Sequence, residues 1–293
     1  MNGDSTHRSL LAGDPPPPRS VGWRTSPASR PLRWLGIVVL GSGTLSAATL
    51  ADGWRALADY RAADAVRIFE RLAGDAGPAA GREARFGQAV ALLARQPITP
   101  VQVEAARGIF ARLAETGTDD IGLGARFHLA RIAQHHAAQP DEAGAARMYR
   151  ELIELRPESV WAQTALSRLA ILEIYVLDPA RPAAERVARA ERLIAVARGA
   201  AAQSELHWIV AEAIFHYRLP PLPALPHLIA AERIGQLEAA THADVLVQIG
   251  ELSAQAGEAV QARAYFQKLL DTYPRDQRGY MVKCKLAELD AHP

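Results

Sequence analysis

One spacing occurs twice in this chain without a gap: an alanine, an aromatic residue four positions later, a leucine three later and a proline five later. The two copies are Ala145, Tyr149, Leu152 and Pro157, and Ala262, Phe266, Leu269 and Pro274. Residues three and four positions apart share one face of an α-helix, so each copy predicts an amphipathic helix that stops before its proline. One helix pair cannot cover such a stripe alone. The repetition therefore predicts an all-α fold of stacked antiparallel helix pairs.

A second helical pattern precedes each copy at a fixed distance. The residues are Leu246, Ile249, Gly250 and Ser253 in one unit, and Leu129, Ile132, Ala133 and His136 in the other. This arrangement resembles the tetratricopeptide repeat (TPR), in which a W-x2-L-G-x2-Y helix is followed by an A-x3-F helix and a proline. The resemblance implies an α-solenoid that binds other proteins and performs no catalysis.

Weaker units fill the remainder of the chain. Two first helices are predicted, at Trp54, Leu57 and Tyr60 and at Val90, Leu93 and Ala94. Four second helices are predicted, at Ala65, Phe69 and Leu72, at Ala106, Phe110 and Leu113, at Ala190, Ile194 and Ala197, and at Ala230, Ile234 and Leu237. Thr99 to Gln102 predicts a capping box at a helix start. We expect about 12 or 13 helices from Asp52 onward, with Tyr280–Leu289 closing the stack.

One segment interrupts the helical pattern. Four prolines between Leu219 and Pro226 forbid a continuous helix there, because each proline lacks the backbone N–H that an α-helix needs. The segment is predicted to be a stiff connector. The alternative is a docking strip for a partner.

The amino-terminal part predicts export. Residues 1–30 carry a run of four prolines among small polar residues, which predicts a disordered lead. Residues 31–51 combine Arg33, the apolar run 34–40 and a small-residue exit, the three parts of a signal peptide. The alternative is an uncleaved signal anchor, since residues 34–51 are just long enough to span a bilayer. Residues 52–293 would then form the TPR-like domain, either periplasmic or anchored in the inner membrane facing the periplasm.

Composition and motifs exclude several classes of partner and of chemical site. The formal net charge of +1 argues against a general nucleic-acid surface. The only cysteine, Cys284, allows no internal disulfide and no CxxC metal site, and its apolar neighbours predict a buried thiol. No phosphate loop, HExxH or nucleophile-elbow motif is present in the sequence, so we expect no cofactor, no metal and no catalytic residue.

Three groups of polar residues have simpler explanations than a catalytic or metal site. His128, His135 and His136 share one helix, but their spacing differs from the i, i+4 pair that zinc favours. Glu212 and His216 are i, i+4 neighbours, which indicates surface electrostatics. Asp119-Asp120 indicates a helix start.

The TPR resemblance also bears on the kind of partner. The carboxylate-clamp positions of chaperone adaptors hold Ala130 and Gln134 in one unit, and Val247 and Glu251 in the last, so that clamp is absent. The segment from Phe266 to Pro274 is similar to repeats of bacterial envelope proteins, including the Tol–Pal coordinator. We therefore predict a non-catalytic envelope scaffold that binds a protein partner. The alternatives are a self-assembling solenoid, with homo-oligomers, and an unrecognised envelope enzyme.

Overall fold

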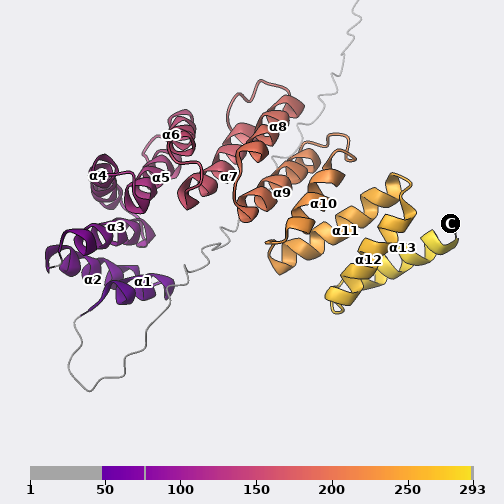
Figure 1. Cartoon of the computed structure of the whole chain (residues 1–293), viewed down its shortest axis with the longest axis horizontal. Helices are drawn as coiled ribbons and strands as arrows, with labels where there is room; N and C mark the ends of the chain where they lie inside the picture. The colour runs from indigo at the N-terminus through magenta and orange to yellow at the C-terminus, as the bar shows by residue number, and fades with distance from the viewer. Residues whose placement is uncertain (1–47, 76, 292–293) are drawn as a thin grey trace, which may run out of the picture. The chain divides into compact units, whose positions relative to one another are not determined.

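The computed structural model describes residues 48–75 and 77–291, and every regular element in these two ranges is helical (Figure 1). The α-helices are α1 Leu50–Ala58, α2 Ala62–Asp75, α3 Pro78–Ala94, α4 Pro100–Glu115, α5 Asp120–His135, α6 Glu142–Leu155, α7 Val160–Tyr175, α8 Ala183–Glu191, α9 Ala200–His216, α10 Ala224–Ile234, α11 Ala239–Gln255, α12 Ala259–Thr272 and α13 Gly279–Ala291. A short 3-10 helix, Arg192–Val196, follows α8. The all-α prediction is confirmed.

The helices stack in chain order. Each α-helix packs against the next one, and the first helices of neighbouring pairs also pack together, α1 with α3, α3 with α5, α5 with α7 and α7 with α9 (Figure 1). The odd-numbered helices from α1 to α11 are called the first helices below, and α13 follows the last pair. This is the TPR-like arrangement of helix pairs predicted from the repeated spacing.

The repeat residues form the buried contacts between paired helices. Tyr149 and Phe266 are both fully buried, and so are the alanines four positions before them. Gly250 lies directly against Phe266: a Cβ atom on this glycine would lie 2.4 Å from Cε1 of the ring. A glycine is therefore needed where α11 and α12 meet, since any side chain would displace the phenyl ring.

Side-chain caps fix several helix starts. Thr99 caps α4 in a capping box with Gln102, and this confirms the prediction made from the sequence. Asp119 caps α5 by accepting a hydrogen bond from the Gly122 N–H at 3.0 Å. Thr49 caps α1, and its own N–H donates a 2.9 Å hydrogen bond to a carboxylate oxygen of Asp52.

The repeat positions of the second unit differ from the prediction. Ala94 is exposed at the end of α3, while Val90 and Leu93 are only half-buried. Gly87 of the same helix packs against the preceding unit: a Cβ atom there would lie 2.6 Å from the ring of Phe69 on α2. The connection at residues 95–99 is longer than a tight turn, so counting back from Ala106 places the first-helix positions too far along the chain.

Two predicted second helices also differ. The stripe from Ala190 to Ala197 is broken, because α8 ends at Glu191 and the 3-10 helix follows. Ala230, Ile234 and Leu237 are only half-buried. The buried stripe of α10 is instead Ala224, Leu228 and Ala231, shifted because this helix starts inside the proline-rich segment.

That proline-rich segment is therefore only partly a connector. Residues 217–223 link α9 to α10, while Pro226 lies in the first turn of α10. A proline is tolerated there because the first N–H groups of a helix have no partner within the helix.

Two side chains near the ends of the stack are exposed against expectation. Cys284 is exposed because it lies two positions from both Val282 and Leu286, which pack into the core, and therefore on the opposite side of α13. Tyr60 is 87% exposed because α1 ends at Ala58 and the tyrosine lies in the following turn.

The amino-terminal predictions fall mainly outside the described residues. The lead 1–30 and most of the signal or anchor segment 31–51 are not described. α1 begins at Leu50, two residues before the expected start of the repeat domain. A search of the described helices finds none with the length and apolar character needed to cross a membrane.

Candidate binding surface on helices α5 and α7

His128 of α5 lies in a cage of aromatic rings. Its ring stacks on Phe110 with centroids 4.9 Å apart, and the centroids of Phe86 and Trp161 lie 5.6 and 5.7 Å away. Trp161 of α7 reaches this cage across Gly124, where a Cβ atom would lie 2.7 Å from the indole. The cage therefore joins three successive helix pairs.

The cage keeps the imidazole neutral. His128 is only 9% exposed, and its Nδ1 atom is buried with no hydrogen-bond partner. Burial, followed by the charges of Arg131 and His136, lowers the pKa of His128 to about 3. At neutral pH the ring is uncharged and has hydrogen-bonding capacity that no described side chain uses.

Two arginines beside the cage have no acidic partner. Arg131 follows His128 by one turn of α5, and Arg168 lies on the adjacent α7. Among the described residues, no carboxylate lies within 4.0 Å of either guanidinium. Nε of Arg131 is buried without an acceptor. Burial, and then the like charge of Arg168, lowers the pKa of Arg131.

The tyrosine near both arginines does not neutralise them. Burial raises the pKa of Tyr149 to about 12, against the opposing effect of Arg168 and Arg131. Its hydroxyl donates a 3.0 Å hydrogen bond to Oε1 of Gln134. His128, Arg131 and Arg168 are called the unpaired-arginine surface below.

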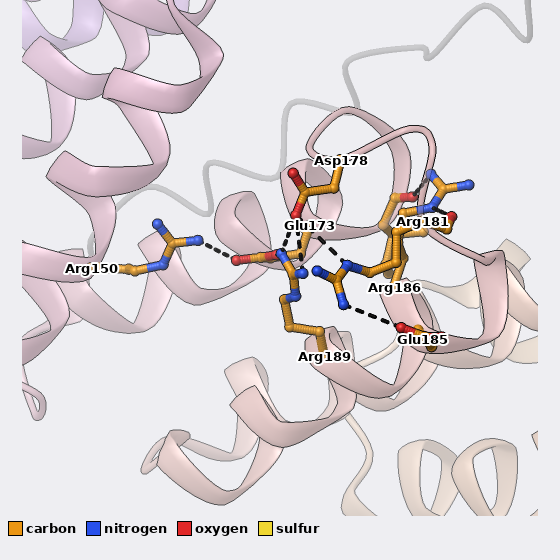
Figure 2. A network of polar contacts seen from close by, with 8 residues as sticks. Arg150, Glu173, Asp178, Arg181, Glu185, Arg186 and Arg189 are labelled. Atoms are coloured by element: carbon orange, nitrogen blue, oxygen red, sulfur yellow. Dashed lines mark hydrogen bonds and ion pairs between the residues drawn. The ribbon is translucent and has the colours of Figure 1, made fainter.

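A second arginine cluster, joining α6, α7 and α8, contrasts with this surface (Figure 2). Glu173 is buried and accepts hydrogen bonds from Arg150 and, at 2.8 Å, from Arg189. Arg189 also binds Asp178 at 3.0 Å. The arginines of this cluster therefore meet carboxylates of the chain itself.

A further buried arginine is satisfied without a carboxylate. Nη1 of Arg186 donates to the Ile174 carbonyl and, at 3.1 Å, to the hydroxyl of Tyr217. The Arg186 guanidinium also lies 4.8 Å from the centre of the Tyr217 ring. These contacts fix the end of α7 against α8 and α9.

The polar groups singled out from the sequence do not converge into a site. The His135 and His136 rings are 6.4 Å apart while His128 is buried in its cage, and the described residues contain no group of metal ligands. The predicted Glu212–His216 pair is absent. Glu212 accepts a 3.4 Å hydrogen bond from Gln248 instead, and burial raises its pKa.

The four residues at the carboxylate-clamp positions are either buried or already bonded to other residues of the chain. Ala130 and Val247 are buried, Gln134 bonds to Tyr149, and Glu251 forms an ion pair with Lys285 at 3.4 Å. These four residues therefore do not form an anion-binding clamp.

Comparisons with known proteins give fold likeness alone. No family model and no curated protein matches the sequence. The chain is similar to a thermophilic TPR protein from Thermus thermophilus, with 18% identity over 71% of this chain and 98% of that one, at a TM-score of 0.37. It is also similar to a TPR protein from Parabacteroides merdae, with 14% identity over 82% of each chain, at a TM-score of 0.41.

Proposed function

We propose that this chain is a non-catalytic scaffold of the bacterial cell envelope that binds a partner protein on the first helices of its TPR-like stack. The observation that carries the proposal is the unpaired-arginine surface. Arg131 and Arg168 lie half-buried on adjacent first helices, and no carboxylate of the described residues lies within 4.0 Å of either guanidinium group. A solenoid presents such groups on a pre-organised frame, which lowers the entropic cost of binding.

The envelope location is part of the proposal and is supported by the amino-terminal sequence. Arg33, the apolar run 34–40 and the small residues after it have the order of an export signal. The capping box of α1 opens at Thr49, immediately after Ala48. A cut after Ala48 would leave the first helix and its cap intact, whereas a cut after Ala51 would remove the cap.

Cross-linking of the full chain in its own cells tests both halves of the proposal. The chain carries a carboxyl-terminal affinity tag and is fractionated before capture. We expect it in the envelope fraction, cross-linked to one partner in a stoichiometric amount. Recovery in the cytosolic fraction would contradict the location. Recovery of the chain alone would contradict the scaffold, and a solution mass that rises with concentration would then favour the self-assembling alternative.

A further inference from the structure

The unpaired-arginine surface indicates the chemistry of the partner. The one acidic residue of α7, Glu173, cannot pair with Arg131 or Arg168, because it is already bound by Arg150 and Arg189. Tyr149 stays protonated. The positive charge of Arg131 and Arg168 is therefore not balanced from within the described part of the chain.

Hydrogen-bonding capacity is unused at the same place. Nε of Arg131 and Nδ1 of His128 are both buried and unpartnered. His128 itself is more than nine-tenths buried. Buried polar groups in folded proteins nearly always have a partner, so two such atoms one helical turn apart mark a place where a bound group would complete the structure.

A carboxylate fits these groups best. The guanidinium group presents N–H donors in a planar fork that matches the two oxygens of a carboxylate. Two guanidinium groups on adjacent helices match an extended segment that carries more than one acid. Trp161, which is half-buried and lies against the His128 ring, offers an apolar face to the remainder of such a segment.

We propose that Arg131 and Arg168, supported by His128, bind carboxylate groups of an acidic segment of the partner protein. The inference rests on the proposed function, because it names the chemistry of the partner at the same surface. Side-chain carboxylates and a free carboxyl terminus share this chemistry, and the choice of probes distinguishes them.

Fluorescence anisotropy with three labelled probes of equal length tests the inference on the full chain. The first probe is a glutamate-rich peptide with an amidated carboxyl terminus, the second an alanine–serine peptide with a free carboxyl terminus, and the third oligothymidylate. We expect the wild-type chain to bind the first probe most tightly, because only this probe offers several carboxylates to the two guanidinium groups. Tighter binding of the second probe would assign the contact to a free carboxyl terminus and overturn the acidic-segment inference. Tighter binding of oligothymidylate than of both peptides would overturn the inference in favour of a nucleic acid.

Matched double variants locate the site. Arg131→Gln with Arg168→Gln should weaken the preferred peptide at least about tenfold, since both charge-assisted contacts are lost. Arg71→Gln with Arg85→Gln removes the same charge from two exposed arginines and should change binding less than about twofold. Equal losses in both double variants would show unspecific attraction and overturn the inference.

A fold control and a conservative variant complete the experiment. Circular dichroism melting of each variant shows whether the stack is intact. Arg131→Lys with Arg168→Lys keeps the charge without the fork, and it should bind more weakly than wild type and more tightly than the glutamine variant. Binding as weak as that of the glutamine variant would show that the fork is required. Binding as tight as that of wild type would show that the fork argument is wrong.

The same variants separate this inference from the proposed function. A cross-linked partner that is still recovered with the glutamine variant would overturn the acidic-segment inference and leave the scaffold standing. Loss of the partner in the glutamine variant, together with its retention in the exposed-arginine control, would support both.

Discussion

Two arginine clusters on neighbouring helices differ in whether their positive charges are paired with a carboxylate. Around Glu173, Arg150 and Arg189 meet a buried carboxylate that holds α6, α7 and α8 together (Figure 2). Around His128, Arg131 and Arg168 have no such carboxylate among the described residues. We expect the first cluster to stabilise the fold and the second to lower its stability in the free protein. The contrast identifies the surface available for recognition, because groups that stabilise the free protein need no partner.

The largest effect is expected at the paired cluster. Glu173→Gln keeps the side-chain volume and removes the negative charge shared by Arg150 and Arg189. We expect the free energy of unfolding to fall by about 3 kcal/mol, the lower end for a broken buried pair, because both arginines reach solvent. Urea unfolding measures this change. A loss below about 0.5 kcal/mol would mean that the cluster acts as a surface ion pair.

A pH-dependent effect of intermediate size is expected at His128. Its pKa is about 3 in the folded protein and about 6.5 in an unfolded chain. Between these values the unfolded state binds more protons, so stability falls as the pH drops below about 6.5. From pH 7 to pH 5 this group should remove about 2 kcal/mol.

The His128→Phe variant isolates that contribution. It should lose about 2 kcal/mol less than wild type between pH 7 and pH 5, whatever its stability at pH 7. The remaining histidines are unchanged in the variant, so their titration cancels in the comparison. Equal losses in wild type and variant, measured by urea unfolding at both pH values, would show that His128 is not buried in the neutral form.

A smaller effect of opposite sign is expected at the unpaired cluster. Arg131→Met keeps an unbranched aliphatic chain and removes a half-buried charge whose Nε atom lacks an acceptor. We expect stability to rise by about 1 kcal/mol, since an unsatisfied buried donor is removed. Thermal melting at neutral pH measures the shift. A destabilised variant would show that the guanidinium group contributes to the fold of the free protein.

The smallest effect is expected at the rim of the paired cluster. Glu185 binds Arg181 at 3.2 Å, with both side chains largely exposed. Glu185→Gln should lower the free energy of unfolding by less than about 0.5 kcal/mol. This variant is the matched control for Glu173→Gln, since both remove one carboxylate from the same network. Equal losses would remove the distinction between a buried and an exposed pair.

Sequence patterns predicted the fold wherever the spacing was regular. The stripes at Ala145–Leu152 and Ala262–Leu269 are buried as expected, because an amphipathic helix determines its own buried face. The prediction was wrong at Ala94, after which a longer connection changes the count. It was also wrong at Cys284, because its apolar neighbours Val282 and Leu286 share a face of α13 from which Cys284 points away.

The candidate surface was not recognised from the sequence, although a local signal exists. Arg67 and Arg107 each have an acid three positions earlier, Asp64 and Glu104, and each forms that ion pair. Arg131 and Arg168 have no acid three or four positions away in either direction. The pattern excludes pairing within one helix. Pairing with another helix depends on packing, which the sequence does not specify residue by residue.

The exposure of Cys284 has a practical consequence for counting molecules. Because the chain contains one cysteine and it is exposed on α13, a maleimide dye would attach once per molecule without any mutation. Single-molecule photobleaching of a labelled assembly would then show as many steps as there are copies. The wild-type thiol is thus a built-in reporter of stoichiometry.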